Sequence, residues 1–442
     1  MRLLNTVLFI FAVNTLLAQS AQQSNDNPPP PDPSIHVCSM DWCGNSGIEE
    51  VYFEIRAMDP PSPQFAYFIT SGCTEGILVT DLPTSSGISV QVHKDDNHLN
   101  GVSTYDLVLI SRHILGTELL DSPYKLIAAD ANKSNTLTSY DLLEIRKLIL
   151  GIYSELPNNT SWRFIPESYE FPNPFNPFAE QFPESMTESE LVQNQGPTQF
   201  LGIKVGDVNC SAIANSLVPV SDDRQNLSLY SLNVQMKSNT VYEVPVFAEG
   251  SLLGLQAALQ IDPALGELVE VLPGVYPGMS AEVFAQRGGE GVRLSWFHHE
   301  PVVLSEKAPL FTLRIRAKSD ASLDQVIQIN PSNLRAEAYT DREEQFDLQL
   351  LFREETQNGL ELFAPYPNPG SGAAFFPVAT QDGGPCILSV YDTRGQLVFS
   401  QKSSLAPGMN QLEIPAEVFV GSGVFIWKME CGGANYSGKL IR

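Results

Sequence analysis

The residues best suited to chemistry are oxygen-bearing side chains that alternate along residues 130–141. They fall at positions one, three, five, nine and twelve of this stretch, and position seven supplies a backbone carbonyl. The six residues are Asp130, Asn132, Ser134, Thr136, Thr138 and Asp141. Ca²⁺ takes six to eight oxygen ligands, and alternate residues of a curled loop can all point inward. The spacing therefore predicts a calcium site. The alternative is an Asx-rich turn that only caps the helix after it.

Two further residues of this stretch suit a calcium loop. Position six normally holds Gly because the backbone turns sharply there, and Asn135 is the residue type that next best tolerates a left-handed backbone. Leu137 at position eight is expected to pack beneath the loop.

A less regular version of the pattern lies 35 residues upstream. The matching residues are Asp95, Asn97, Gly101 (through its carbonyl), Ser103 and Asp106. Position five is Leu99, which has no side-chain oxygen. Starting the loop at Asp96 puts Asn100 at position five but leaves the loop one residue short. In either register a ligand is missing or displaced, so calcium binding by this loop stays open.

A detached Gly206-Asp207-Val208-Asn209 follows both loops in the sequence. We expect Asp207 to fold back to the upstream loop and to supply the oxygen that Leu99 cannot.

Other chemistries find little support. His298-His299-Glu300 is a histidine cluster with no further ligand placed by spacing, and we expect a loop at a strand end. Cys38 and Cys43 lack a second ligand pair. The sequence has no G-x-S-x-G, H-E-x-x-H or P-loop pattern. A glycosidase needs two placed carboxylates in a cleft, and no segment is long enough for one. We therefore expect a protein that is not an enzyme.

Each loop runs into a segment of helical periodicity. Residues 103–116 (STYDLVLISRHILG) recur as residues 138–151 (TSYDLLEIRKLILG). Both copies end in Gly, a common C-terminal stop of a helix. The sequence therefore predicts a duplicated loop–helix unit over residues 95–152.

These repeats resemble type I dockerins, whose calcium loop ends in Asp and runs into a helix. In that family GDVN normally opens the first loop, whereas here it follows both. The resemblance implies calcium as a cofactor and a cohesin-type protein as a partner.

The other modules favour β-structure, so the expected fold class is multidomain and mainly β, with β-sandwich modules and a small α-helical pair. Strands are predicted at Val51–Ile55, Phe65–Ile69 and Ile88–Val92. Residues 34–94 resemble a carboxypeptidase-regulatory-like β-sandwich. Residues 153–215 form an aromatic and Pro-rich strap, expected to wrap a neighbouring domain.

Residues 226–352 resemble the cohesin β-sandwich through an alternating strand, an IDP turn followed by LVEV, an LSW strand and LFTLRIRAK. Cohesins bind dockerins or, in related modules, carbohydrate. The resemblance therefore implies a protein or glycan partner.

Residues 361–442 resemble the type A C-terminal sorting domain of type IX secretion, from YPNP through VYDTRGQLV to the terminal GKLIR. The resemblance implies recognition by the type IX secretion machinery, followed by display on the outer-membrane surface or release from the cell.

Export is also expected from the N-terminus. Arg2 precedes an apolar run and a small polar zone, which predicts a signal peptide over residues 1–21 and a linker over 22–33. No later run is apolar over about 18 residues, so no transmembrane segment is expected in the mature chain. The expected location is extracellular or on the outer-membrane surface, reached through the periplasm.

Six cysteines can pair in an exported protein. We expect Cys386 to bond Cys431, because each lies on or beside a strand of one small domain. Cys38 could pair with Cys43 or with Cys73, and the sequence does not choose.

The charge excludes one class of partner. Acidic residues outnumber basic ones 51 to 26, giving a net charge of −25, and nucleic acid binding needs clustered Lys and Arg. We expect a calcium-stabilised, non-catalytic modular protein whose dockerin-like pair docks within its own chain. The alternative is a scaffold or accessory protein of extracellular polysaccharide degradation.

Overall fold

The computed structural model describes residues 35–44, 46–57, 65–69, 77–79, 88–187, 198–215, 224–286, 288, 291–332, 334–342, 344–353, 360–363, 365–366, 368–370, 372–380, 383–419 and 423–442. The expected signal peptide and linker lie outside these residues. The expected fold class is confirmed, because the chain is mainly β with a few helices.

Two four-stranded sheets, β4-β1-β8-β6 and β3-β2-β5-β7, form an N-terminal module. Their strands are β1 (Ile35–Asp41), β2 (Val51–Ala57), β3 (Phe65–Ile69), β4 (Ile77–Val79), β5 (Ile88–His93), β6 (Trp162–Pro166), β7 (Ser185–Thr187) and β8 (Thr198–Lys204). Buried Phe53, Val90, Phe164 and Phe200 fill the core between the sheets. The strands expected at residues 51–92 are confirmed.

The N-terminal module does not end at residue 94. Strands β6, β7 and β8 come from residues 153–215, which were expected to form only a strap, and β8 pairs in parallel with β1. The reason lies in Trp162–Pro166, whose five residues are all buried. A segment buried on both faces belongs inside a layered structure rather than on its surface.

Three helices are inserted between β5 and β6: α1 (Thr104–Leu115), α2 (Pro123–Ala129) and α3 (Ser139–Ile149). Capping boxes begin α1 and α3, each formed by a hydroxyl residue and an Asp three positions later. Gly116 and Gly151 follow them with φ of 71° and 69°, as expected of helix stops. Helix α2 was not predicted; Ser122 caps it and Pro123 starts it.

The helices cover the outer face of the β4-β1-β8-β6 sheet. Leu107, Ile110 and Ile145 pack with Ile165 and Ile203 of the sheet in one buried cluster. The aromatic residues of the strap add to this cluster, since Phe171 contacts Tyr124 edge-on at 5.7 Å between ring centroids. The strap therefore wraps the helices, as expected, while also supplying strands.

The middle module is a β-sandwich with the elements β9 (Asn226–Leu232), β10 (Gln235–Met236), β11 (Val241–Ala248), β12 (Gly250–Ile261), β13 (Gly266–Pro273), η2 (Ala281–Val283), β14 (Phe284–Gln286), β15 (Gly291–Leu304), β16 (Phe311–Ala317), β17 (Ala321–Ser322), α5 (Leu323–Val326), β18 (Ile327–Ile329), β19 (Glu337–Thr340) and β20 (Gln345–Arg353). Strand β11 belongs to both layers, because it pairs with β16 and then with β9. Buried Val244, Leu255, Trp296 and Leu313 lie in the core.

The C-terminal module contains β21 (Leu360–Leu362), β22 (Ala374–Thr380), β23 (Gly384–Tyr391), β24 (Leu397–Leu405), β25 (Gly408–Ile414), η3 (Ala416–Val418), β26 (Val424–Cys431) and β27 (Ala434–Ile441). The sheet β24-β23-β26-β27 packs on β21, β22 and β25. Strand β25 meets β11 at the pair Met409–Glu243, which joins this module to the sandwich.

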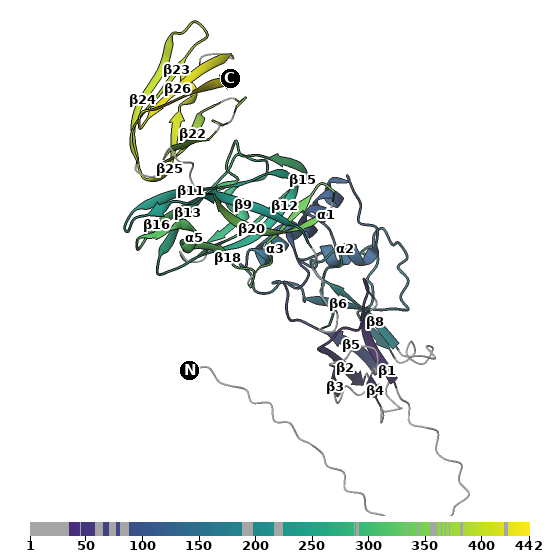
Figure 1. Cartoon of the computed structure of the whole chain (residues 1–442). Coiled ribbons are helices and arrows are strands. Elements are labelled where there is room, and N and C mark those ends of the chain that lie inside the picture. Colours follow the sequence, from purple (N-terminus) through teal and green to yellow (C-terminus); the bar gives the residue numbers. More distant parts are fainter. Residues whose placement is uncertain are drawn as a thin grey trace, which may run out of the picture.

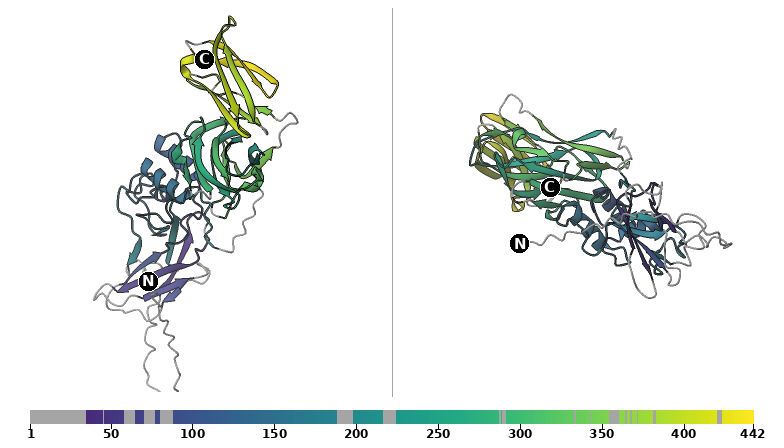
Figure 2. Two further views of the ribbon diagram at one scale, coloured as in Figure 1. Left: turned by 90° about the vertical axis from the view of Figure 1, so that its left-hand side faces the viewer. Right: turned by 90° about the horizontal axis from the view of Figure 1, so that it is seen from below.

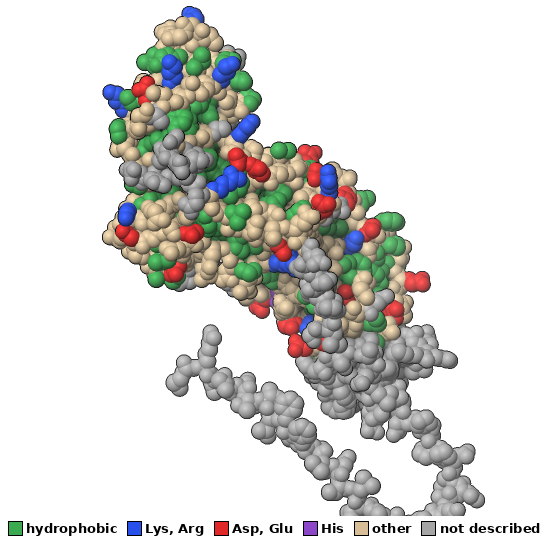
Figure 3. All heavy atoms as spheres, in the orientation of Figure 1, with side chains coloured by type: hydrophobic (Ala, Val, Ile, Leu, Met, Phe, Trp, Pro, Cys, Tyr) green, Lys and Arg blue, Asp and Glu red, His purple; other side chains and the backbone are tan. Residues whose placement is uncertain are grey.

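The modules follow one another along the molecule (Figures 1 and 2). The helices lie between the N-terminal module and the sandwich, and the C-terminal module lies beyond the sandwich (Figure 1). On the face shown in Figure 3, acidic and basic side chains are interspersed among apolar ones. Within the described residues, no helix is both long and apolar enough to cross a membrane.

Candidate functional site

The contiguous loop, residues 130–141, closes on its own first and last carboxylates. Asp130 accepts hydrogen bonds from the backbone N–H groups of Ser134 and Asn135, both at 2.9 Å. Asp141 accepts from the N–H groups of Asn132 at 3.2 Å and Thr138 at 2.9 Å. Both carboxylates are fully buried. The first and last candidate ligands therefore lie together inside the loop.

The backbone of this loop explains its residue types. Lys133 and Asn135 have φ of 56° and 61°, in the left-handed region, which Asn adopts more readily than most residues. Ser134 Oγ donates to the carbonyl of Thr136 at 3.1 Å, so positions five and seven are adjacent. Leu137 packs against the helical core. The expectations for Asn135 and Leu137 are confirmed.

A second loop of the same kind is built from two distant pieces of chain. Residues 207–212 form its first half and residues 101–106 its second half, and we call it the split loop. Its candidate ligands at positions one, three, five, seven, nine and twelve are Asp207, Asn209, Ser211, Gly101 (carbonyl), Ser103 and Asp106.

The split loop repeats the hydrogen bonds of the contiguous loop. Asp207 accepts from the N–H groups four and five residues on, at Ser211 (3.1 Å) and Ala212 (2.8 Å). Asp106 accepts from the N–H groups of Asn209 (3.2 Å) and Ser103 (2.9 Å). Ser211 Oγ donates to the carbonyl of Gly101 at 2.8 Å. Each bond has its counterpart at the same loop position of residues 130–141.

The two halves meet at Gly101 and Ala212. A Cβ on Gly101 would lie 2.5 Å from Ala212 Cα, and Gly101 has φ of 74°, so a side chain is excluded twice over. Asn100 then bonds the backbone of Ile213 through both its amide nitrogen (2.9 Å) and its oxygen (3.0 Å). These contacts bring residues 212 and 101 together, so that the two halves of the split loop meet as if they were consecutive in the chain.

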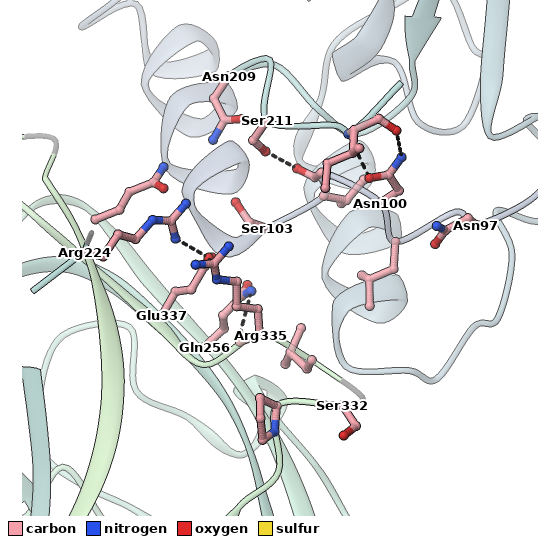
Figure 4. Close-up of a pocket in the computed structure, with 17 residues that line it drawn as sticks. Asn97, Asn100, Ser103, Asn209, Ser211, Arg224, Gln256, Ser332, Arg335 and Glu337 are labelled. Atoms are coloured by element: carbon pink, nitrogen blue, oxygen red, sulfur yellow. Dashed lines mark hydrogen bonds and ion pairs between the residues drawn. The ribbon is translucent and has the colours of Figure 1, made fainter. Parts of the chain in front are cut away.

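Asp207 folds back to the upstream loop as expected, but it takes position one and not the position of Leu99, which Ser211 fills. Asp95 and Asn97 do not join the loop. Asp95 accepts from the N–H of Ser161 at 2.8 Å and pairs with His98 at 3.1 Å. Asn97 lies apart from Ser103, Asn209 and Ser211 (Figure 4). The reason is local. Residues 97–100 form a turn, with Asn100 N–H donating to the Asn97 carbonyl at 3.0 Å, while Leu99 packs toward the helical core.

The carboxylates of both loops are electrostatically costly to bury. Burial, and then repulsion from Asp207, raises the pKa of Asp106 well above its ordinary value. Burial raises the pKa of Asp207 to about 6. Burial, with repulsion from Asp130 as a smaller cause, raises the pKa of Asp141. The buried amine of Lys204 donates a hydrogen bond to the carbonyl of His98 at 2.8 Å. Burial lowers the pKa of Lys204 to about 7.

The donor sets fit a hard cation. Each loop offers two carboxylates with amide, hydroxyl and carbonyl oxygens, the ligands that Ca²⁺ takes. Asn209 Oδ1 is buried and accepts no hydrogen bond from the described residues, and a buried polar atom normally has a partner. Across those same residues no group of three or more His, Cys, Asp or Glu is placed to hold a metal.

Helix α1 docks on the sandwich of the same chain by its first turn. Thr104 N–H donates to Gln256 Oε1 at 2.7 Å, and Thr104 Oγ1 lies 2.8 Å from Ser295 Oγ. The ring of Tyr105 stacks on that of Tyr339 at 5.2 Å between centroids. These five residues are all buried, so the contact excludes solvent from the start of the helix.

The end of α3 completes the contact. Arg293 of β15 donates to the carbonyl of Ile149 at 3.2 Å, and Arg146 lies over the ring of Phe297 at 4.8 Å. The expectation that the helical pair docks within its own chain is confirmed.

The two repeats expose their equivalent residues differently. Tyr140 and Leu143 of the second repeat stand where Tyr105 and Val108 stand in the first. Tyr105 and Val108 are buried, yet Tyr140 and Leu143 are 51% and 40% exposed.

A polar cavity of about 310 Å³ separates the split loop from the sandwich. Figure 4 shows Ser103, Asn209 and Ser211 on one side and Arg224, Arg335 and Glu337 on the other. Glu337 accepts from both arginines, at 2.6 Å and 3.0 Å. The charged groups here are paired with one another, so the cavity is a polar seam between two modules.

The cysteines correct one expectation and confirm another. Cys386 bonds Cys431 as expected. Cys43 bonds Cys210 at position four of the split loop, so the Cys38–Cys43 alternative is wrong. Cys38 is itself disulfide-bonded, and Cys73 lies outside the described residues.

His298, His299 and Glu300 lie within β15 rather than in a loop at its end. The rings of His298 and His299 contact each other at 4.3 Å between centroids. The strand continues through them because Val302 and Leu304 resume the buried alternation.

Sequence reasoning missed Asn209 and Ser211 as candidate ligands. The signal was present, because Asp207, Asn209 and Ser211 repeat the spacing of Asp130, Asn132 and Ser134.

No protein-family model matches the chain, and no curated protein matches it significantly. Similar solved structures include the sixth cohesin of scaffoldin B from Acetivibrio cellulolyticus in complex with the Cel5 dockerin. It is 11% identical with a TM-score of 0.24, and the match covers 29% of this chain and 95% of that one. A non-cellulosomal cohesin from Archaeoglobus fulgidus is 12% identical with a TM-score of 0.19, covering 30% and 94%.

Dimeric latent PorU from Porphyromonas gingivalis is 8% identical with a TM-score of 0.19. The match covers 89% of this chain and 30% of that chain.

Proposed function

We propose that this chain is a secreted, non-catalytic modular protein in which Ca²⁺ fixes a dockerin-like helical pair against a cohesin-like sandwich of the same chain. The observation that carries the proposal is the match between the two loops. A contiguous and a split stretch of chain adopt the same hydrogen bonds around buried carboxylates. Two stretches of different connectivity thus reach the same all-oxygen arrangement.

Calcium has a structural role in this proposal. When bound, it would neutralise carboxylates that otherwise repel one another in a buried setting. The residues that would hold it are those of the two loops. Asp106 both closes the split loop and caps α1, so the same residue links the metal site to the helix whose first turn docks on Gln256 and Ser295.

The proposal includes export by type IX secretion, supported by the YPNP, VYDTRGQLV and GKLIR segments of the C-terminal module. Truncation after residue 353 in a bacterium that possesses this machinery should leave the protein in the periplasm. Normal surface display of the truncated chain would contradict the proposal.

The proposal also states that the chain is not an enzyme and binds a protein or glycan partner. A scaffold role is the alternative, and the exposed Tyr140 and Leu143 favour it because they repeat the docking residues of α1. The alternative would be supported if this chain pulled down a separate cohesin-like module and the Tyr140→Ala variant did not.

The test of the calcium proposal is calorimetric titration of the mature chain. Wild type should bind two Ca²⁺, and Asp141→Ala and Asp207→Ala should each bind one. If the wild type gave no binding heat, the calcium proposal would be wrong and the helical unit would act only as a spacer between modules. If Asp207→Ala still bound two Ca²⁺, the split loop would be excluded as a calcium site, but the contiguous loop would not.

A further inference from the structure

The disulfide between Cys43 and Cys210 lies within the split loop. Cys210 occupies position four, between the candidate ligands Asn209 and Ser211. Its φ of 64° is close to the φ of 56° at Lys133, the position-four residue of the contiguous loop. The bond is therefore attached to the loop while position four keeps the left-handed backbone that both loops adopt there.

The first half of the split loop is held on two sides. One side meets the second half of the loop at Gly101, as described above. On the other side, the connection between β1 and β2 holds the residues that follow. Glu49 N–H donates to the carbonyl of Ala214 at 3.0 Å, and Asn215 Nδ2 donates to the carbonyl of Gly47 at 2.9 Å.

The disulfide adds a covalent link to these two hydrogen bonds. After reduction, residues 207–215 would be held against the β1–β2 connection by hydrogen bonds and packing alone. Ordering them around a cation would then cost more conformational entropy, because the reduced chain has more freedom to lose.

The two disulfides that the structure describes in full differ in exposure. Cys210 is exposed and Cys43 is half-buried, whereas Cys386 and Cys431 are 1% and 2% exposed. A thiol in solution must reach a disulfide sulfur to reduce the bond, so an accessible disulfide reacts before a buried one. Of these two bonds, the one within the split loop is therefore the first to be reduced.

We propose that the Cys43–Cys210 disulfide is a redox control of calcium binding at the split loop. The loop binds Ca²⁺ tightly while the bond is intact and weakly once a thiol has reduced it. The contiguous loop contains no cysteine, so its affinity is the same in both redox states. This inference rests on the proposed function, since it takes the split loop to be a calcium site.

The reduction consumes two thiol groups, which one dithiol can supply. A thiolate attacks Sγ of Cys210, forms a mixed disulfide with it and displaces Cys43 as a thiolate. A second thiolate attacks the sulfur of the first reductant thiol and displaces Cys210 as a thiolate. The two cysteine thiolates take up the two protons that the reductant lost. The products are two cysteine thiols and the disulfide of the reductant, with two electrons transferred.

The experiment compares the oxidised full chain with the same chain treated with dithiothreitol under native conditions. Alkylation followed by mass spectrometry should label Cys43 and Cys210 before Cys386 and Cys431. Calorimetric titration with Ca²⁺ should give two sites in the oxidised chain. In the reduced chain one site should be weakened about tenfold or more and the other unchanged. Equal affinities in the two redox states would overturn the inference, and so would earlier labelling of the buried pair.

Two variants test whether the bond itself is responsible. The double variant Cys43→Ser, Cys210→Ser should bind calcium as the reduced wild type does, with or without dithiothreitol. Lys133→Ser is the matched control, because it changes position four of the contiguous loop, whose side chain is not a candidate ligand. It should leave both affinities as they are in the wild type. If the double variant does not fold, the reduced wild type decides alone, because it keeps the bond between Cys386 and Cys431.

Thermodynamic linkage gives a second readout. If reduction weakens calcium binding at the split loop, calcium must oppose reduction of that bond by the same factor. Saturating calcium should therefore lower the equilibrium constant for reduction of the Cys43–Cys210 bond about tenfold or more. Alkylation at several ratios of reduced to oxidised dithiothreitol measures this constant. The same constant with and without calcium would contradict the redox control.

The outcomes separate this inference from the calcium proposal. Two calcium sites whose affinities do not change on reduction would overturn only the redox control. One site in both redox states would leave calcium in the contiguous loop and overturn the redox control. No calcium binding by the oxidised chain would overturn both.

Discussion

At the scale of single residues, the split loop separates side chains that merely fit a spacing from those that share a site. Asn97 and Asn209 both satisfy position three of a calcium pattern. Only Asn209 lies beside Asp106, whose carboxylate accepts from its N–H, and its side-chain oxygen is buried without a donor from the described residues.

These two asparagines make a matched pair. Asn209→Ala should lower calcium affinity at one of the two sites about tenfold, because a ligand oxygen is lost. Asn97→Ala removes the same amide outside the loop and should leave both affinities unchanged. Calorimetry on the two variants measures this, and a larger effect for Asn97 would restore the contiguous version of the upstream loop.

The raised pKa values of Asp106, Asp141 and Asp207 predict opposite pH responses with and without calcium. Without calcium the folded state holds more protons than the unfolded state between about pH 4, the unfolded value, and about pH 6, the value for Asp207. The free energy of unfolding therefore falls as pH rises through this window. The pKa of Lys204 is lowered to about 7, so this residue makes the free energy of unfolding depend on pH only above that value.

With calcium, protons compete for the same oxygens, so calcium affinity should fall as pH drops below about 6. Thermal unfolding at pH 5 and pH 7 checks both signs. The calcium-free chain should be the more stable at pH 5, and the gain in melting temperature from calcium should be the larger at pH 7. A calcium-free chain that is more stable at pH 7 would show that these carboxylates are not buried as described.

At the scale of elements, two copies of one loop–helix unit have taken different roles. Both helices begin with a hydroxyl residue followed by Tyr. Thr104 and Tyr105 of α1 are buried against the sandwich, whereas Ser139 and Tyr140 of α3 are exposed.

Truncation of the two tyrosines should show this difference. Tyr105→Ala removes a ring stacked on Tyr339 and should destabilise the chain by about 3 kcal/mol. Tyr140→Ala removes a ring that is 51% exposed and should change the free energy of unfolding by about 0.5 kcal/mol or less. Chemical denaturation measures both. Equal effects would mean that the docked face contributes no more than the exposed one.

Elements with a strong local signal could be predicted from the sequence. The periodicity of α1 and α3, their capping boxes and the glycines after them are local, and so is the loop at residues 130–141. The origin of β6 and β8 could not be predicted, because their partners lie far along the chain and Trp162 and Phe164 suit a strap as well as a core strand.

The split loop could be predicted only in part. The sequence predicts that Asp207 folds back to the upstream loop, but not that it opens the loop at position one. The spacing of Asp95 and Asn97, however, could not be distinguished from that of a working loop, because the sequence does not show where Leu99 packs.

At the scale of the whole molecule, the two loops lead into α1 and α3 of the helical layer between the N-terminal module and the sandwich. Chelation should loosen this layer first, because the buried carboxylates of the loops would repel one another. A protease time course with and without chelator should show new early cuts between residues 95 and 215, with the sandwich and C-terminal module persisting. Identical digestion patterns would count against a structural role for calcium.

The disulfide between Cys43 and Cys210 gives the molecule a property that concerns mechanical force. It closes a covalent ring over a sequence separation of 167 residues. All of the contiguous loop lies inside that ring, whereas Ser211 and Ala212 of the split loop lie just beyond its closing bond. Tension entering through β1 passes across the sulfur atoms to residue 210 and onward to the sandwich, so it bypasses the helices. For a chain pulled between a cell surface and a bound partner, reduction of this bond would release a hidden length of roughly 550–600 Å. Until then, the contiguous loop is shielded from the load, whereas the split loop lies on its path through Ser211 and Ala212.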